Sequence, residues 1–256
     1  TVAAGRLGLR AAILGVAGND LFGRANAADF AYNHVDVSHL KLREERRTNF
    51  CVCVSERSIN GKEFISCPGD FEPLAPQELD ADFIRSAKIL HIGDMLTPAK
   101  FAAAELIHGA GGVVSIDAAY YRPDIYENYR YLDIFIASET YLNAMRADKG
   151  NLSCEEACRY IRAQGPEIVM FTLGERGCCG VQGDQYFELP AFTVDAVDTT
   201  AAGDVFHGAF NYAWLQGESA RECARFSSAV SAIKCTRLGG RAGIPSVETV
   251  KKYLET

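Results

Sequence analysis

The chain contains the segment Val197-Asp198-Thr199-Thr200-Ala201-Ala202-Gly203-Asp204-Val205-Phe206-His207-Gly208-Ala209-Phe210. Its first half is a turn of small residues with little side-chain bulk. Its second half predicts a helix, because apolar residues recur at the spacing of one buried helix face, at Val205, Phe206, Ala209, Phe210, Ala213 and Trp214. We therefore expect a helix that begins directly after a tight turn.

The residues of this turn indicate a binding site for an anion. Thr199 and Thr200 are candidate N-cap residues, and Ala201–Gly203 leave backbone N–H groups free at the helix start. These donors and the positive end of the helix dipole point the same way, which attracts anions. Asp204 would lie beside a bound phosphate, where a carboxylate can accept a proton from an attacking hydroxyl. The simpler alternative is a capped helix in which Asp204 only complements the dipole.

This segment closely resembles the second signature of the ribokinase-like (PfkB-type) carbohydrate kinases, Asp-Thr-x-(Gly/Ala)-Ala-Gly-Asp. The resemblance implies that Asp204 is the catalytic base and that the backbone of Ala201, Ala202 and Gly203 forms the anion hole. It extends over the chain from Val2 to Ser246, and its central and C-terminal motifs are the specific ones.

Composition narrows the classes of partner. The chain has 256 residues, of which 48% are hydrophobic, enough for the full core of one domain. A net charge of -7 argues against nucleic acids and anionic membranes as partners, and no apolar run is long enough to cross a bilayer. The nine cysteines lack metal-type pairing, so we expect free thiols and a cytoplasmic location.

The first third of the chain predicts a small β structure beside a helix. Residues 24–40 predict a helix and a turn, and residues 49–54 and 63–66 predict a hairpin closed by Asn60-Gly61. By resemblance, residues 40–70 belong to the small β-sheet lid that covers the sugar and often mediates dimerisation. We also expect a further strand and a Gly-Gly motif to precede Thr1, since the family's first signature begins upstream of it.

From Leu79 onward, strands alternate with helices, which favours a parallel sheet with helices on both faces. The predicted strands lie within residues 87–94, 112–117, 133–139 and 167–177. Open α/β sheets bind ligands at the carboxyl ends of their strands. Polar residues and a glycine fall there, namely Asp94, Asp117, Arg122, Ser138, Thr172 and Gly174.

The resemblance implies a nucleotide site along this edge. Thr172-Leu-Gly-Glu-Arg-Gly177 matches a Thr-x-Gly-x-x-Gly loop that lies along the ribose and phosphates of ATP, and residues 223–246 resemble the wall of the adenine pocket. The implied ATP-binding residues are Ser138, Thr172, Gly174, Glu175, Gly177, Gly203, Ser228, Ala232 and Gly239. Asp94, Arg122 and Asp204 are the implied contacts to the acceptor.

The resemblance also implies two cations. Ser138-Glu139-Thr140-Tyr141 occupies the position of an Asn-x-x-Glu motif that orders water around Mg²⁺, and here only Glu139 offers a carboxylate. A monovalent cation, K⁺ in the expected case, would be held beside the anion hole by backbone carbonyls and neighbouring groups. Those positions are Asp198, Thr200, Lys234, Arg237, Gly239 and Gly243. For Lys234 the expected ligand is the carbonyl, since its side chain carries a positive charge.

We therefore predict an α/β protein with a ribokinase-like three-layer α/β/α sandwich, a mainly parallel sheet and a small β-sheet lid. Residues 1–256 would form one kinase domain. The predicted function is transfer of the γ-phosphoryl group of ATP to a primary hydroxyl of a small carbohydrate of the ribose, ketose or keto-sugar acid type. A homodimer through the lid is the expected assembly. The alternatives are a nucleoside or vitamin kinase of the same fold, or a binding protein without kinase activity.

Overall fold

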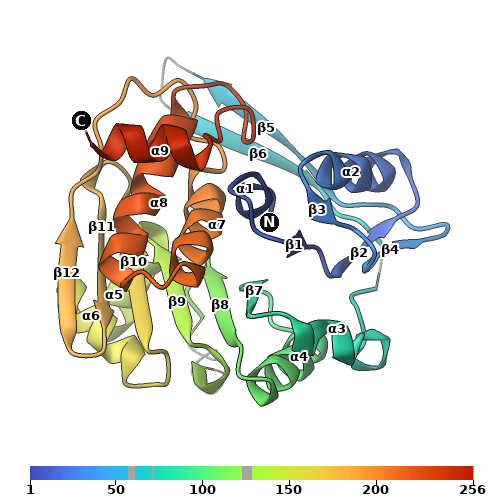
Figure 1. Cartoon of the computed structure of the whole chain (residues 1–256), viewed down its shortest axis with the longest axis horizontal. Helices are drawn as coiled ribbons and strands as arrows, with labels where there is room; N and C mark the ends of the chain where they lie inside the picture. The colour runs from blue at the N-terminus through green and yellow to red at the C-terminus, as the bar shows by residue number, and fades with distance from the viewer. Residues whose placement is uncertain (57–60, 71, 123–128, 256) are drawn as a thin grey trace. The chain divides into compact units, whose positions relative to one another are not determined.

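The computed structural model describes residues 1–56, 61–70, 72–122 and 129–255. Contacts divide the chain into two compact units. The smaller unit comprises Thr1–Gly5 and Arg10–Leu74, and the larger unit comprises Arg6–Leu9 and Ala75–Thr256. Figure 1 follows the chain through both of them.

The larger unit is built on a six-stranded sheet in the order β12-β11-β10-β9-β8-β7. Its strands are β7 (Ile89–Gly93), β8 (Val113–Ala118), β9 (Ile134–Ser138), β10 (Ile168–Thr172), β11 (Cys178–Gln182) and β12 (Gln185–Leu189). The first four run parallel, and β11 pairs antiparallel with both β10 and β12. The four predicted strands are confirmed, whereas the edge hairpin β11–β12 was not predicted.

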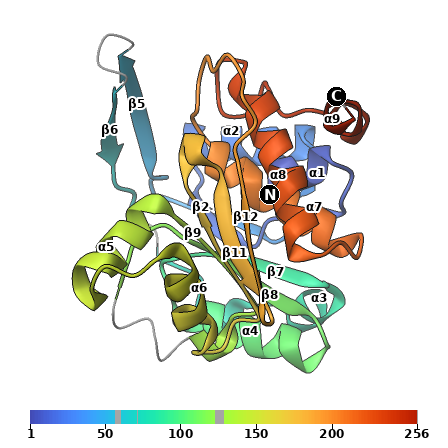
Figure 2. The ribbon, with the colours of Figure 1, turned by 90° about the vertical axis from the view of Figure 1, so that its left-hand side faces the viewer.

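Helices cover both faces of this sheet (Figures 1 and 2). One face carries α4 (Pro98–Gly109), α5 (Glu139–Lys149) and α6 (Cys154–Arg162). The other carries α7 (Ala202–Leu215) and α8 (Ala220–Cys235), with α9 (Val247–Leu254) packed on α8. Two shorter elements, η1 (Pro76–Glu78) and α3 (Ala81–Ser86), pack against α4. The predicted three layers are thereby confirmed for this unit.

The central strands β9 and β10 are apolar up to their last residue because both of their faces are covered. In β9, the residues from Ile134 to Ala137 are each at most 1% exposed, and Val169, Met170 and Phe171 of β10 are completely buried. On α7, Phe206 and Phe210 pack into the same core as Ile136 and Met170. The buried face predicted for this helix is therefore confirmed.

The smaller unit contains short parallel strand pairs and a hairpin. After α1 (Val2–Arg6), its elements are β1 (Ala11–Ala12), β2 (Gly15–Gly18), α2 (Leu21–Tyr32), β3 (Val35–Asp36), β4 (Leu40–Arg43), β5 (Phe50–Glu56) and β6 (Gly61–Cys67). β1 pairs with β3 and β2 with β4 in parallel, while β5 and β6 are antiparallel. The predicted hairpin is confirmed, and Asn60 of its turn lies outside the described residues.

The start of α2 is closed by side-chain hydrogen bonds. Asp20 is the N-cap, and its carboxylate accepts from the N–H of Gly23 at 2.8 Å. It also accepts from the N–H of Thr48 at 2.7 Å and from the Thr48 hydroxyl at 2.8 Å. Gly23 lies so close to the preceding strand that an added Cβ would be 1.9 Å from the Gly18 carbonyl oxygen. Helix and strand are thus locked together here.

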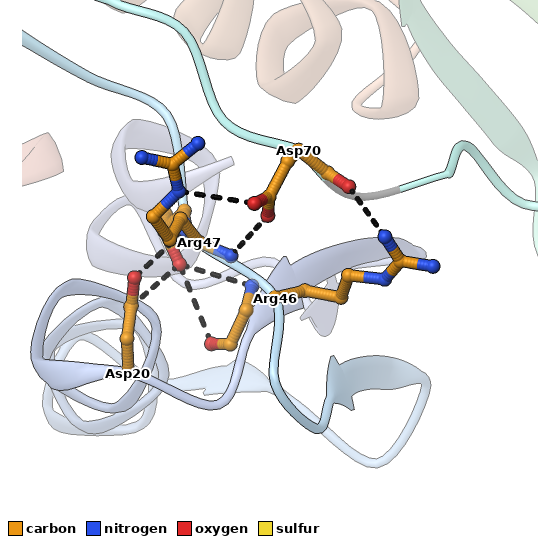
Figure 3. Close-up of polar contacts among 6 residues, drawn as sticks. Asp20, Arg46, Arg47 and Asp70 are labelled. Carbon is orange, nitrogen blue, oxygen red and sulfur yellow. Dashed lines mark hydrogen bonds and ion pairs between the residues drawn. The ribbon is translucent and has the colours of Figure 1, made fainter.

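A second set of hydrogen bonds ties the chain before β5 to the chain after β6 (Figure 3). Asp70 accepts from the backbone N–H of Arg47 at 2.5 Å and from its Nε at 3.0 Å. The carbonyl of Asp70 accepts from Arg46 at 3.4 Å. Hydrogen bonds from Arg47 hold the pKa of Asp70 below its ordinary value. Both strands of the hairpin are therefore anchored at their base.

Candidate active site

The helix α7 begins without a capping side chain. Its N-cap is Ala201, which adopts the left-handed conformation with φ 60° and offers no side-chain acceptor. The prediction of Thr199 or Thr200 as N-cap is therefore wrong, because the left-handed turn places both residues ahead of the helix. Glycine adopts this conformation without strain. Every residue with a Cβ is strained in it, and alanine has the smallest such side chain.

Backbone donors at this helix start remain open. In the described part of the chain, the N–H groups of Ala201 and Gly203 have no hydrogen-bond partner, whereas the N–H of Ala202 donates to the Thr199 carbonyl at 3.2 Å. A Cβ added at Gly203 would meet no atom within 4 Å. Asp204 follows in the first turn and is exposed. We call Ala201–Gly203 the cradle.

Asp198 fixes the loop that leads into the cradle. Its carboxylate accepts from the N–H of Thr200 and from the N–H of Gly239, both at 2.8 Å. The hydrogen bonds from Thr200, followed by the one from Gly239, hold the pKa of this carboxyl far below its ordinary value. The N–H groups of Val197 and Asp198 donate to the Cys235 carbonyl, which joins the loop to the end of α8.

Side chains on one face of α8 form hydrogen bonds with the cradle and with the loop that precedes it. The Ser231 hydroxyl donates to the carbonyl of Ala202 at 3.0 Å. Lys234 is completely buried, and its Nζ donates to the carbonyl of Asp198 at 2.9 Å and to that of Thr200. The predicted cation ligands Asp198 and Thr200 thus bind an ammonium group. The sequence pointed to the carbonyl of Lys234, but its side chain makes these contacts.

The remaining positions predicted for the cation lie around the backbone of Lys234. Its carbonyl accepts from the exposed Arg237 at 3.2 Å. A Cβ added at Gly243 would be 2.3 Å from that carbonyl oxygen, so the C-terminal turn packs directly against the end of α8. Gly239 takes part through its backbone, since its N–H donates to the carboxylate of Asp198.

The Thr-x-Gly-x-x-Gly loop follows β10 and contains a short 3-10 helix, η3 (Gly174–Arg176). Thr172 ends the strand, and its hydroxyl donates to the Ala137 carbonyl at 3.4 Å. Gly174 and Gly177 have positive φ, and a Cβ at Gly177 would be 2.0 Å from the Leu189 carbonyl oxygen. Only glycine fits at Gly177. Glu175 is exposed at the tip of the loop.

A pocket opens between the end of β12 and α8. Its volume is about 220 Å³, and it is lined by Leu189, Pro190, Ala191, Phe192, Arg225 and Ser228. The hydroxyl of Ser228 lies 4.0 Å from the Sγ of Cys178, directly after the glycine loop. Ala232, the other small residue predicted for this wall, lies one turn further along α8 and is half-buried. Ser228, Ser231 and Lys234 are spaced three residues apart, so one helix face connects the pocket with the cradle.

The three residues at the predicted magnesium position differ in their burial and in their polar partners. Ser138 caps α5, and its hydroxyl accepts from the N–H of Tyr141 at 3.3 Å. Tyr141 is completely buried, with its hydroxyl 2.7 Å from that of Tyr129. Glu139 is half-buried and forms an ion pair with Arg176 of the glycine loop. Of these three residues, Glu139 is therefore the one that carries a charge.

The ends of β7 and β8 hold the residues predicted for the acceptor, together with a pair that the sequence did not reveal. Asp94 accepts from the N–H of Tyr120 at 3.2 Å, and Arg122 is exposed. Asp117 lies 3.2 Å from Nε2 of His207, which is three residues after Asp204 on α7. Burial raises the pKa of Asp117, but the hydrogen bond from His207 and the charge interactions with His207 and His91 together leave the pKa below its ordinary value. That spacing of three residues was the only signal for this pair.

The comparisons with known proteins decide the family. The model of the pfkB family carbohydrate kinases matches residues 1–247. The chain belongs to this family. It is 30% identical to the probable fructokinase-2 of Arabidopsis thaliana, over 96% of the chain and 81% of that protein. The predicted family and the class of alcohol-directed phosphotransferases are thereby confirmed.

Solved structures give the same result for the fold. The ribokinase of Thermotoga maritima superposes with a TM-score of 0.86 at 26% identity, covering all of this chain and 85% of that one. The Arabidopsis thaliana ribokinase, solved with ribose and ATP, superposes with a TM-score of 0.84 at 23% identity, over 100% and 85% of the two chains. The ribokinase-like fold is therefore confirmed. Within the described residues, no helix combines the length and apolar character needed to span a membrane.

Proposed function

We propose that this pfkB-family kinase transfers the γ-phosphoryl group of ATP to a primary hydroxyl of a small sugar, with ribose, ketoses and keto-sugar acids as the acceptor classes. In this proposal the two units belong to one kinase domain. The observation that carries it is the uncapped start of α7, where open N–H groups adjoin the exposed carboxylate of Asp204.

Each part of the cradle has a task in this reaction. The open N–H groups of Ala201 and Gly203 hold the negative charge that develops on the transferring phosphoryl group. Asp204 accepts the proton of the attacking hydroxyl, and its place in the first helical turn puts it beside that charge. The catalytic effect comes mostly from positioning and electrostatic stabilisation, as in other phosphoryl transfers.

The nucleotide would extend from the pocket to the cradle along α8. Ser228 and Lys234 are six residues apart, which is about 9 Å along a helix axis, and a nucleoside triphosphate can span that distance. The apolar lining of the pocket suits a base, while the backbone of Gly174 and Gly177 allows close approach of ribose and phosphates. ATP in the Arabidopsis ribokinase supports this assignment for a related fold.

Magnesium would accompany the nucleotide, bound through phosphate oxygens and water. Glu139 is the side chain that we assign to its water shell, and the ion pair with Arg176 positions this carboxylate next to the glycine loop. Asp94 and Arg122 remain the proposed acceptor contacts. The nine cysteines are all free of disulfides, which supports a reducing compartment such as the cytoplasm.

We further propose a homodimer through the hairpin β5–β6. Large apolar side chains of this hairpin are 47% to 63% exposed, namely Val52, Val54, Phe64 and Ile65. Val52, Val54 and Ile65 share one face of the two-stranded ribbon, and such a patch favours burial against a second copy. Analytical ultracentrifugation checks it, and a monomer at the highest soluble concentration contradicts the dimer.

The kinase assignment is tested by ADP release with ribose, fructose and other ketoses, keto-sugar acids, nucleosides and vitamin alcohols. With the acceptor found in this way, Asp204→Asn should lower kcat by about 10³-fold while ATP binding is retained, because the base is lost and the fold is not. Asp195→Asn, at an exposed position in the loop before the cradle, is the matched control and should leave kcat unchanged.

The outcomes separate the alternatives. A nucleoside or vitamin alcohol as sole acceptor would assign a different kinase of the same fold. ATP binding without any turnover would favour a binding protein. Near-normal kcat in Asp204→Asn would overturn the role of Asp204.

A further inference from the structure

We infer that the ammonium group of Lys234 takes the place of the monovalent cation that the family resemblance implies, so that this kinase needs no K⁺. The inference rests on the proposed function. It identifies the residue that holds the anion-binding backbone of the cradle in place. Lys234 acts here as a positioning residue, because its side chain contacts the backbone of the turn.

The residues around the implied cation position do not fit a K⁺ ion together with Lys234. The two carbonyls expected to bind the ion, those of Asp198 and Thr200, both accept hydrogen bonds from Lys234 Nζ. An ammonium group is a compact positive charge of nearly the same size as K⁺, and both seek oxygen atoms. A second cation at these oxygens would meet a like charge at contact distance with little water to screen it. The side chain and the ion therefore exclude each other.

The ammonium group is held in place by its surroundings. The side chain of Lys234 is completely buried, and such a charge is stable only when its donors are satisfied and a negative charge is near. The carboxylate of Asp198 supplies that charge within the same loop, and its attraction to Lys234 helps to lower the pKa of Asp198. Gly243 packs on the backbone of Lys234.

The planarity of the peptide bond explains how this contact acts on the cradle. The carbonyl of Thr200 and the N–H of Ala201 belong to one peptide group and point in opposite directions. When Lys234 binds that carbonyl, the open N–H of Ala201 must point away from α8. A hydrogen bond at the carbonyl also polarises the amide and makes its N–H a stronger donor. Lys234 thus orients and strengthens one donor of the anion hole.

The first experiment measures the cation dependence of the unchanged protein. Activity is assayed with ATP and Mg²⁺ in buffers whose only monovalent cation is a bulky amine, and K⁺ is then added, with choline as a control for ionic strength. We expect kcat and KM to be independent of K⁺. A K⁺-specific rise in kcat of the unchanged protein would overturn the inference, whether or not any variant folds.

The second experiment uses two variants that remove the same charge but leave different space. Lys234→Ala opens the position, and we expect kcat to fall by about 10²-fold and to recover with K⁺, ammonium or methylammonium. Lys234→Met fills the position with an uncharged chain of similar length, so kcat should fall equally without recovery. Lys251→Ala, an exposed lysine on α9, is the control and should behave like the unchanged protein. A loss in Lys234→Ala that no cation restores would overturn the inference.

Thermal unfolding distinguishes failure of this inference from failure of the proposed function, because it needs no acceptor. K⁺ should raise the Tm of Lys234→Ala more than choline does, since an ion that binds only the folded state stabilises it. It should leave the Tm of the unchanged protein and of Lys234→Met at the choline value. A K⁺-specific shift in the unchanged protein would count against the inference even if no sugar were phosphorylated.

Discussion

The starts of α2 and α7 are built in opposite ways. At α2, the carboxylate of Asp20 receives three hydrogen bonds from Gly23 and Thr48. At α7, the N-cap Ala201 has no side chain to offer, and the N–H groups of Ala201 and Gly203 stay open. The carboxylate near this second start, Asp204, sits inside the first turn and is exposed.

This difference separates a helix start that serves stability from one that serves binding. A capped start satisfies its own donors and gains stability from them. An uncapped start keeps its donors for a ligand and must be stabilised from outside. At α7 that support comes from Asp198 and from Ser231 and Lys234 of α8. An acidic residue near a helix start therefore indicates a capped helix only if it occupies the N-cap position.

After the loss of Asp204, the next largest expected effect comes from closing the open start. Ala201→Asp places a carboxylate at the N-cap in a left-handed conformation that aspartate tolerates. The new carboxylate would take the cradle donors and repel the phosphoryl group, so we expect kcat to fall by about 10²-fold without a loss in Tm. Steady-state kinetics and thermal unfolding measure the two effects.

Ala201→Asn is the matched control for this change. It has the same shape and the same tolerance for the left-handed conformation, but no charge. We expect a smaller loss of kcat than in Ala201→Asp. Equal kcat values in the two variants would show that the charge at this position is irrelevant to catalysis, contrary to the assigned role of the cradle.

A pair of glycine substitutions compares the space at the two starts. In Gly23→Ala the new Cβ would be 1.9 Å from the Gly18 carbonyl oxygen, so the free energy of unfolding should fall by about 3 kcal/mol. In Gly203→Ala the new Cβ meets nothing, and the higher helix propensity of alanine should add about 1 kcal/mol. Urea unfolding measures both values.

At Gly203 we expect the alanine substitution to lower activity although it raises stability. Its methyl group would enter the space above the cradle, and we expect kcat to fall by at least about tenfold although the protein is more stable. A Gly203→Ala variant with unchanged kcat would mean that the phosphoryl group does not approach this residue.

The smallest effect concerns acid stability at the closed start. The hydrogen bonds from Gly23, and next those from Thr48, lower the pKa of Asp20 to about 2, against about 3.9 in an unfolded chain. A depressed folded-state pKa contributes stability above the unfolded value, and this contribution is lost as the pH falls towards about 2. The free energy of unfolding of Asp20→Asn should therefore fall less between these two pH values than that of the unchanged protein. Parallel curves would contradict the ionised cap.

Much of the fold could be predicted because its signals are local. The strands β7 to β10 are mostly apolar runs, and hydrophobic alternation flanking Asn60-Gly61 indicates the hairpin β5–β6. The edge strands β11 and β12 were missed because Cys178–Gln182 and Gln185–Leu189 mix small, polar and apolar residues without a clear period. Pairing with β10 makes them strands, and a single sequence does not display that partner.

The site was predictable in its residues and less so in its geometry. The signature led directly to Ala201–Gly203 and Asp204, but threonine's preference for N-cap positions concealed the left-handed turn at Ala201. The direction of the Lys234 side chain depends on carbonyls far away in the sequence. The contact between Asp117 and His207 likewise joins a strand and a helix that only the folded sheet brings together.

The support under the cradle also has a consequence for synthesis of the protein. Lys234 binds carbonyls that lie 36 and 34 positions earlier, and Gly239 binds Asp198 41 positions earlier. Contacts over such separations form only after a long loop has closed. When residues 197–210 have just emerged from the ribosome, the nascent chain thus contains the whole signature but not yet the residues that hold it in place. Under the proposed function, phosphoryl transfer then has to wait until Lys234 and Gly239 have also been synthesised and have packed against the loop.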